Sequence, residues 1–444
     1  MKIVIAGAGS VGRHLAKLMA RENIDIVIMD KKPEHFMDLG ENYDLMTMEG
    51  SPTSIHDLEN AGIKNADLFV AVTPSESANT TSCIFANRLG AKKTLARIDN
   101  YEYLLPKNKE IFEKIGVNYL IYPEVLASEE IIQSLKTSWL RQHMYFCNGA
   151  LELLAIKIRS NAVILNKKFS TGFFNHEKYR IVAIKRKNRT IIPKGEDWVL
   201  ANDIVYVIAS PQNIEFVRQN FGKEDYPIKN IMILGGSRIA QKTAQSLPKS
   251  VNVKIIERDK EKSHLLAEKL ENTLVINADG RDVEVLVEEG IKEMDAVVAV
   301  TENSEENILS CLIAKRFGIR KTIAEVENID YITLAESMDI GTVINKKTIT
   351  ASYIYQLMLD ADVLNVKNLT LVNAEVVEFV AKEGSKITKK PIKNLNLPDN
   401  VNLGGIIRNG VGGVVFGNTQ IAPNDHVIVF CAAASIRKLE SFFN

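Results

Sequence analysis

A chain of 444 residues with 46% hydrophobic side chains is long enough for roughly three or four packed domains. Lysines and arginines number 55 and so do aspartates and glutamates, which leaves a formal net charge of zero. This balance argues against binding of nucleic acid or anionic lipid through an overall basic charge. The longest apolar runs, such as residues 68–72, are far shorter than the about 20 residues of a membrane-spanning helix. We therefore expect a globular multidomain protein without a nucleic acid partner.

The cysteines and histidines are spread along the chain. The cysteines at positions 83, 147, 311 and 431 lie far apart, which is typical of buried, reduced thiols in a cytosolic protein. The seven histidines show no metal-ligand spacing with the cysteines or with one another. We therefore expect no disulfide and no metal site.

The first elements are a short apolar run at residues 2–6 and a helical pattern at residues 11–20. The loop that joins them has the spacing of a dinucleotide-binding fingerprint and consists of Gly7, Ala8, Gly9, Ser10, Val11 and Gly12. In such a loop the glycines let backbone N–H groups at the start of the helix reach a pyrophosphate. The alternative is a glycine turn that serves only packing.

The second predicted strand, residues 24–29, ends at Asp30, which lies 18 residues past Gly12. A carboxylate at this place accepts hydrogen bonds from the adenosine ribose hydroxyls and disfavours a 2′-phosphate. Together, the strand before the loop, the helix after it and this acid favour binding of NAD over NADP.

The next predicted strands, at residues 44–48, 68–72, 94–97 and 119–121, alternate with helices, which indicates a doubly wound parallel sheet. Ligands of such sheets sit beyond the carboxyl ends of the strands. The residues that follow or end these strands are therefore candidates for the nucleotide site, and they are Ser51, Thr73, Pro74 and Arg97. For Arg97 a surface ion pair remains an equal alternative.

The region that follows is smaller and rich in β pattern. A polar turn leads into a strand-like run at residues 204–208, and a short amphipathic helix is expected at residues 213–220. The polar stretch 222–227, which contains Gly222 and Pro227, is the best candidate for a linker.

The chain then repeats itself. Residues 61–73 match residues 289–301 at an offset of 228, and Asn79 matches Asn307 and Cys83 matches Cys311 at the same offset. The smaller β-rich region also recurs, with a helix expected at residues 434–443. The order is therefore A-B-A-B, where A is the nucleotide-binding unit and B the smaller unit.

The second A unit departs from the first at its expected site. Its loop is Gly235, Gly236, Ser237, Arg238 and Ile239, so that serine replaces the second glycine of the fingerprint. Glu257 takes the role of Asp30, Glu325 replaces Arg97, and the loop at residues 301–306 carries three acids. Because negative charge near a pyrophosphate weakens its binding, we expect the second site to bind a nucleotide more weakly, or to bind a less charged nucleotide.

None of the histidines in the sequence has the setting of a proton donor or acceptor beside a nicotinamide. We therefore expect no catalytic residues. An NAD-dependent oxidoreductase is kept as the alternative, and hydride transfer from bound NADH would distinguish it from a nucleotide sensor.

Several features occur together in this sequence, namely the glycine loop, Asp30, residues 67–73 and Arg97. In addition, a B unit follows each A unit. In these features the sequence resembles the TrkA family of cytosolic subunits of bacterial Trk potassium uptake systems. The resemblance implies two Rossmann-like domains, each followed by a small α+β domain, with boundaries at 1–138, 139–225, 226–362 and 363–444. It also implies a first nucleotide site at residues 7–11, Asp30, Ser51, Thr73, Pro74 and Arg97. The second site would be residues 235–239, Glu257 and Asp279.

The resemblance further implies a regulatory subunit that binds NAD or NADH, and ATP or ADP as alternative ligands. Its partner would be a membrane potassium transporter subunit of the TrkH or TrkG kind, on the cytosolic face of the inner membrane. The subunit itself would form a homo-oligomeric ring, either dimer or tetramer. The helices expected at residues 124–137 and 348–359 resemble subunit-crossing helices of the family, and ordinary core packing is their other interpretation. A regulator of another cation channel remains a further alternative.

Overall fold

The computed structural model describes residues 1–20, 24–37, 39, 43–171, 173–174, 177–187, 189–358, 363–368, 374–398, 401–431 and 436–443. The chain divides into two compact units. The first consists of Met1–Leu126 with Lys347–Leu359, and the second of Ala127–Lys346 with Asp360–Asn444. Among the described residues, none of the helices has both the length and the apolar character needed to cross a membrane.

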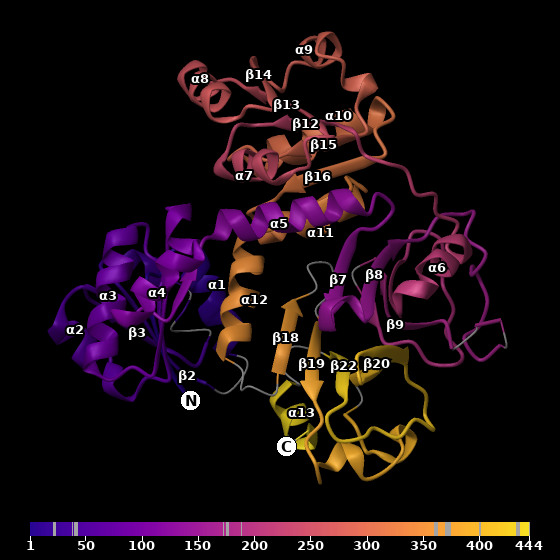
Figure 1. Ribbon diagram of the computed structural model, residues 1–444, viewed down its shortest axis with the longest axis horizontal. Coiled ribbons are helices and arrows are strands. Elements are labelled where there is room, and N and C mark those ends of the chain that lie inside the picture. Colours follow the sequence, from indigo (N-terminus) through magenta and orange to yellow (C-terminus); the bar gives the residue numbers. More distant parts are fainter. Residues whose placement is uncertain are drawn as a thin grey trace. The chain divides into compact units, whose positions relative to one another are not determined.

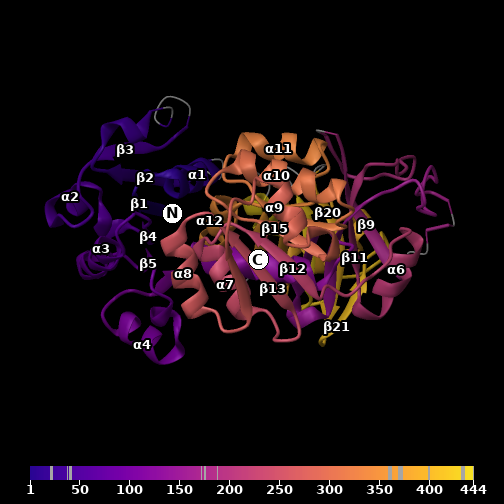
Figure 2. The same cartoon turned by 90° about the horizontal axis from the view of Figure 1, so that it is seen from above.

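The first unit is built on a parallel sheet, which Figure 1 shows in indigo and purple. In spatial order its strands are β3 (Met46–Glu49), β2 (Asp25–Asp30), β1 (Lys2–Ala6), β4 (Leu68–Ala71), β5 (Lys93–Arg97) and β6 (Tyr119–Ile121). Its helices are α1 (Ser10–Met19), α2 (Ile55–Asn60), α3 (Glu76–Leu89) and α4 (Pro106–Lys114). The strand order reverses at β1, and α1 and α3 lie on opposite sides of the row of strands (Figure 2). This is the doubly wound arrangement expected from the alternating pattern.

The second unit contains an equivalent parallel sheet. In spatial order its strands are β14 (Thr273–Asn277), β13 (Asn252–Glu257), β12 (Asn230–Leu234), β15 (Ala296–Ala299), β16 (Lys321–Glu325) and β17 (Thr342–Ile344). Its helices are α7 (Arg238–Ser246), α8 (Lys260–Lys269), α9 (Val283–Glu288), α10 (Ser304–Arg316) and α11 (Ile329–Ser337). The predicted duplication is thus confirmed strand by strand. Cys83 and Cys311 are both fully buried, as expected of equivalent core positions.

The second unit also holds two antiparallel sheets. The first has the spatial order β10 (Arg189–Ile191), β9 (Tyr179–Arg186), β11 (Ile204–Ala209), β8 (Leu151–Lys157) and β7 (Gln142–Phe146), followed by α6 (Ile214–Asn220). The second has the order β18 (Val363–Asn368), β19 (Glu375–Val380), β22 (His426–Cys431), β20 (Val401–Arg408) and β21 (Val411–Val414), followed by α13 (Ile436–Phe443). Each α+β domain follows its parallel sheet in the chain, as predicted.

The two antiparallel sheets share one hydrophobic core. Phe146, Leu153 and Tyr206 of the first sheet pack in the same cluster as Val376 and Phe430 of the second. Equivalent ion pairs brace both sheets, because Arg186 contacts Asp203 at 2.9 Å and Arg408 contacts Asp425 at 2.6 Å. The B units therefore pack against each other within one chain.

Two helices belong to a different unit from the parallel sheet that precedes them in the chain. Most of α5 (Pro123–Lys136), which follows β6, belongs to the second unit, and the Ser134 hydroxyl donates to Thr342 of β17 at 3.2 Å. Conversely, nearly all of α12 (Lys346–Met358), which follows β17, belongs to the first unit. The two helices thus exchange units within the chain, and their role as subunit-crossing helices stays a prediction.

Candidate nucleotide sites

Two of the three fingerprint glycines in the first loop are required by the fold itself. Gly7 has φ of 107°, in the left-handed region, and its N–H donates to the Met29 carbonyl at 2.8 Å. A Cβ on Gly12 would lie 1.9 Å from the Gly7 carbonyl oxygen, so helix α1 packs directly on the loop. Gly9 differs, because a Cβ there would have nothing within 4 Å. The fold leaves open space at Gly9, where a pyrophosphate would approach.

Helix α1 begins without a side-chain cap among the described residues. Gly9 occupies the N-cap position with extended backbone, and no side chain accepts a hydrogen bond from the first turn there. The first-turn N–H groups lie at the positive end of the helix dipole and have no intrahelical acceptor. An anion placed beside Gly9 would satisfy them.

Asp30 at the end of β2 holds the loop from the other side. Its Oδ2 accepts from the Ala8 N–H at 2.7 Å, and its Oδ1 accepts from the Lys32 N–H at 3.0 Å. Burial works to raise the pKa of this carboxyl, but the N–H groups of Ala8 and Lys32 and the His35 ring outweigh it, so that the pKa lies below its usual value. The carboxylate is therefore ionised at neutral pH and has free lone pairs for ribose hydroxyls.

A buried asparagine ties together the loops after β4 and β5. Asn79 of α3 is 1% exposed, and its Oδ1 accepts from the Thr73 N–H at 3.0 Å, while its Nδ2 donates to the Arg97 carbonyl at 2.9 Å. Thr73 and Arg97 are thus held at one edge of the sheet. The sequence comparison matched Asn79 with Asn307 but gave neither a role, although a polar residue repeated within an apolar core was a usable signal.

The remaining predicted residues of the first site lie at the same strand ends. Ser51, after β3, donates its N–H to Asp57 Oδ2 at 2.8 Å, and Pro74 is exposed beside Thr73. The Arg97 guanidinium lies 3.7 Å from Asp99 and 4.0 Å from Glu124, so both ion pairs are longer than hydrogen bonds. Its side chain is 24% exposed. The ion-pair interpretation thus has support, and these long contacts leave the donors of the guanidinium able to turn to a phosphate.

The second loop has the same backbone contacts as the first, but the helix that follows it begins with a different N-cap residue. Gly235 has φ of 95°, and its N–H donates to the Ile256 carbonyl at 2.9 Å, as Gly7 does to Met29. Ser237 stands at the N-cap of α7, and its Oγ accepts from the Ala240 N–H at 3.3 Å. The first turn of α7 therefore has a side-chain acceptor that the first turn of α1 lacks.

Glu257 replaces Asp30 one position earlier and reaches the same place with a longer side chain. Its Oε2 accepts from the Gly236 N–H at 2.7 Å, and its Oε1 accepts from the Asp259 N–H at 2.8 Å. Burial acts to raise its pKa, but these hydrogen bonds and Lys262 bring the pKa of Glu257 below its usual value. The acid that holds the loop is thus conserved in function between the two copies of the unit.

A cavity of about 350 Å³ lies beside the second loop, and Gly235, Gly236, Ser237, Glu257 and Asp279 line it. The other two residues predicted for this site, Arg238 and Ile239, begin α7, and Ile239 is buried.

Acidic groups dominate the lining of this cavity. The described lining residues include five acids and three bases, and the acids are Glu257, Asp259, Asp279, Glu302 and Glu306. Asp279 stands where the first copy has Ser51, and its hydrogen bonds with the Arg281 side chain and N–H lower its pKa to about 2. The lining therefore opposes a doubly charged pyrophosphate.

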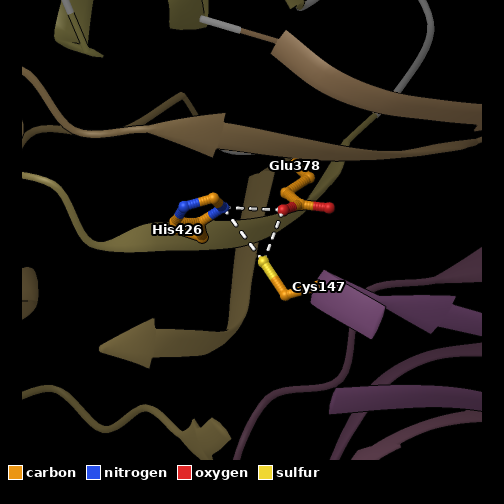
Figure 3. Close-up of side chains that lie close together, drawn as sticks. All are labelled: Cys147, Glu378 and His426. Carbon is orange, nitrogen blue, oxygen red and sulfur yellow. Dashed lines mark hydrogen bonds and ion pairs between the residues drawn. The ribbon is translucent and has the colours of Figure 1, made fainter. Parts of the chain in front are cut away.

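One cluster that the sequence did not predict lies away from both loops. Cys147, Glu378 and His426 point toward one another from the two antiparallel sheets (Figure 3). Cys147 is only partly buried, which corrects the expectation that all the cysteines are buried core residues. Its neighbours are distant in sequence, so the pattern of residues near Cys147 gave no signal.

Family models match both kinds of domain. The TrkA-N domain matches residues 3–123 and 231–346, and the TrkA-C domain matches residues 153–222 and 376–444. A Trk system potassium uptake protein TrkA of Haemophilus influenzae is 33% identical over 453 residues, with 100% of this chain and 98% of that protein covered. A protein of the same description from Vibrio alginolyticus is 32% identical, with 97% of this chain and 95% of that protein covered.

Solved structures show the same fold. The crystal structure of the GsuK RCK domain has a TM-score of 0.62 at 15% identity and covers 100% of this chain and 94% of its own. The GsuK channel bound to NAD has a TM-score of 0.61 at 15% identity, covering 100% of this chain and 78% of its own. GsuK bound to ADP has a TM-score of 0.51 at 14% identity, covering 80% and 69%.

Proposed function

Because the chain belongs to the TrkA family, we propose that it is a regulatory subunit of potassium transport whose first loop senses a bound nucleotide. The observation that carries this proposal is the uncapped start of α1 beside open space at Gly9, with the Asp30 carboxylate bound to the Ala8 N–H of the same loop. These groups form an anion site next to a hydrogen-bond acceptor, as a dinucleotide requires.

We propose NAD or NADH as the ligand of the first site, with ATP and ADP as competitors. The fit of Asp30 to an unmodified ribose supports NAD over NADP. Support for both ligand types comes from the similarly folded GsuK channel, which was solved with NAD and with ADP. The second site would bind the same ligands more weakly, because its helix is capped by Ser237 and its cavity is acidic.

Regulation would follow from unequal affinity of the nucleotide for two conformations of the subunit. A ligand shifts such an equilibrium only by the ratio of its affinities for the two states. A site that joins the ends of β1, β2, β4 and β5 supplies such a difference, because movement of any of these loops changes the contacts to the ligand. The receiver of the signal would be a TrkH- or TrkG-like membrane subunit, with this chain in a homo-oligomeric ring at its cytosolic face.

Potassium uptake provides the test. We would delete the gene from its own host, restore either the wild-type chain or Asp30→Ala, and measure potassium uptake while purifying membrane partners of the tagged chain. We expect a potassium transporter to co-purify with both forms, and uptake to depend on nucleotide only with the wild type. Normal uptake in the deletion strain, or the absence of any cation transporter among the partners, would contradict the proposal.

We propose regulation rather than catalysis at these sites. The expected outcome with purified protein is saturable NADH binding without oxidation of NADH when candidate acceptors are supplied. Sustained NADH oxidation that Asp30→Ala abolishes would instead favour the oxidoreductase alternative.

A further inference from the structure

The turn that follows β7 meets the second antiparallel sheet at a cluster of three side chains. The Cys147 Sγ lies 2.9 Å from Glu378 Oε1 and 3.0 Å from His426 Nδ1. The remaining side of the triangle, from His426 Nδ1 to Glu378 Oε1, is 2.8 Å. A thiol sulfur, an imidazole nitrogen and a carboxylate oxygen thus converge on one point (Figure 3).

The backbone fixes all three positions. In the ladder of β19 and β22, Glu378 pairs with Ile428, so His426 is its diagonal neighbour on the same face of the sheet. Cys147 and Asn148 have φ of 44° and 53°, both in the left-handed region that few non-glycine residues adopt. This strained turn is maintained where it directs the thiol at the other two groups.

Hydrogen bonding alone explains the triangle poorly. A hydrogen bond requires a near-linear arrangement with its proton between two atoms. Three atoms that are mutually within 3.0 Å cannot have a linear hydrogen bond on every side with the protons that a thiol and a neutral imidazole supply. Donor atoms arranged around a common cation take this form without needing protons between them.

We propose that Cys147, Glu378 and His426 bind one divalent transition-metal ion, with Zn²⁺ as the best match. Sulfur, nitrogen and oxygen donors together are the ligand types that zinc accepts. With metal–ligand distances of about 2.0–2.3 Å, tetrahedral zinc would hold these three donors slightly farther apart than they are here and would leave a fourth position for water. The His426 side chain is 30% exposed, which gives the ion and a water ligand access.

A nucleophilic cysteine is the other role that a thiol beside an imidazole can have. Such a cysteine needs a lowered pKa. Here burial comes first and the Glu378 carboxylate second in raising the pKa of Cys147 to about 12. The raised pKa argues against a nucleophilic cysteine, and the proposal of a metal site rests on the positions of the three donor atoms.

A bound ion would clamp the two antiparallel sheets. Cys147 is 231 residues from Glu378 and 279 residues from His426 in the sequence. The sheets already share an apolar core that includes Phe146 and Phe430. Metal binding would add a polar crosslink at the edge of that core and stabilise the folded pair by mass action.

The test uses the full-length chain after treatment with a chelator. Co²⁺ alone is titrated and followed by its thiolate charge-transfer absorption, and Zn²⁺ is then added to displace it. We expect one equivalent per chain and a rise in Tm with Zn²⁺. Cys147→Ser should abolish the charge-transfer band, and His426→Asn and Glu378→Gln should each weaken affinity at least tenfold.

Two controls separate the site from adventitious binding. Cys431→Ala removes another thiol from β22, the strand of His426, and His264→Asn removes an exposed histidine that pairs with Glu268. Both should keep the band and the affinity. Absence of a band in the wild type, or an unchanged band in Cys147→Ser with a normal unfolding transition, would overturn the proposal.

A different observation concerns a cavity of about 530 Å³ in the same unit, between the first antiparallel sheet and the second parallel sheet. Its basic lining includes Arg141, Lys157, Arg159, Lys223, Lys315 and Lys321. Asp339 neutralises part of this charge, through ion pairs with Arg141 and Arg159. More cations than anions therefore line this cavity, which is open to solvent on one side.

Burial and the neighbouring cations lower the pKa of Lys223 to about 8 and that of Lys321 to about 7. Concentrating positive charge in this way costs free energy unless an anion compensates it. We infer that the cavity binds a small polyanion that carries phosphate groups. None of the residues that line this cavity also lines the cavity beside the second glycine loop, so this site would be additional to the nucleotide sites.

Inorganic pyrophosphate is the probe. Calorimetric titration of the full-length chain should show a binding event that Lys223→Gln weakens at least tenfold and that Asp30→Ala leaves unchanged. Lys168→Gln, at an exposed lysine paired with Glu196, is the matched control. Binding that is absent, or equally strong in Lys223→Gln, would overturn the inference.

Discussion

The first and second parallel-sheet domains share the contacts that hold their glycine loops, but they differ in the groups that would contact an anion. In both, an acid at the end of the second strand holds the glycine loop, and a buried asparagine links the loops after the fourth and fifth strands. The differences lie at the contact positions, where Ser237 replaces Gly9, Asp279 replaces Ser51 and Glu325 replaces Arg97. Duplication has thus kept the groups that build the site and changed those that would meet a phosphate.

Each altered residue of the second domain already has a partner within that domain. Ser237 caps α7, Arg281 pairs with Asp279 at 2.6 Å, and Lys346 lies 3.8 Å from Glu325. A site whose polar groups are already paired gains less from a ligand, because existing interactions must be given up. This difference is the physical basis for expecting unequal affinities.

The largest expected effect is at the acid that holds each loop. Asp30→Ala leaves the Ala8 N–H without its acceptor and removes the ribose contact, so NADH affinity at the first site should fall by about 10- to 100-fold. Glu257→Ala is the matched change in the second domain and should leave the tight binding event intact. Calorimetric titration of each full-length variant measures both. Equal losses in the two variants would show that the sites are not distinct.

Exchanging the N-cap residue should have a smaller effect. In Gly9→Ser the new hydroxyl would cap α1 as Ser237 caps α7, and we expect about a tenfold loss of NADH affinity. The reverse change, Ser237→Gly, should strengthen nucleotide binding in the second domain. The same titrations check this pair, and a gain of affinity in Gly9→Ser would contradict the role assigned to the uncapped helix.

A weaker effect is expected where Asp279 replaces Ser51. Asp279→Ser removes one partly exposed carboxylate from the second cavity, so nucleotide affinity there should rise by about threefold. Ser51→Asp in the first domain should lower affinity by a similar factor. Fluorescence titration with NADH is sensitive enough for both, and both effects should shrink as salt is raised.

The smallest effect concerns acid stability. Asp279 has its pKa lowered from 3.8 to about 2 by Arg281, so its contribution is present above about pH 4 and is lost as the pH falls toward about 2. Unfolding curves of the wild type and Asp279→Asn should therefore converge with falling pH over this range. A constant difference between the curves down to pH 2 would mean that the ion pair adds nothing to folding.

Most of the fold and both glycine loops could be predicted from the repeated pattern of the sequence. Alternating strands and helices, the glycine spacing, and Asp30 with its counterpart Glu257 could all be identified locally, and the structure places them as expected. The exchange of α5 and α12 between the two units could not be predicted from the sequence. Helical periodicity shows that one face of a helix is buried, but it does not show which sheet covers that face.

The cluster of Cys147, Glu378 and His426 shows the limit of spacing rules. Metal-binding motifs are recognised in a sequence by short spacings between their ligands. These three residues are far apart in the sequence and meet only because the two antiparallel sheets pack together. Arg97 shows a similar limit, since its partner Asp99 lies in the loop after β5 and its partner Glu124 lies in the first turn of α5. Contacts between side chains of different elements depend on how those elements pack, so the structure is needed to identify them.

The most direct test of the central claim is a calorimetric titration of the full-length wild-type chain with NADH, repeated with Asp30→Ala and Glu257→Ala. We predict one tight binding event per chain, which Asp30→Ala weakens by about 10- to 100-fold and Glu257→Ala retains, with any second event weaker. Two equal tight events in the wild type, or a tight event that survives Asp30→Ala, would contradict the claim that the first loop is the nucleotide sensor.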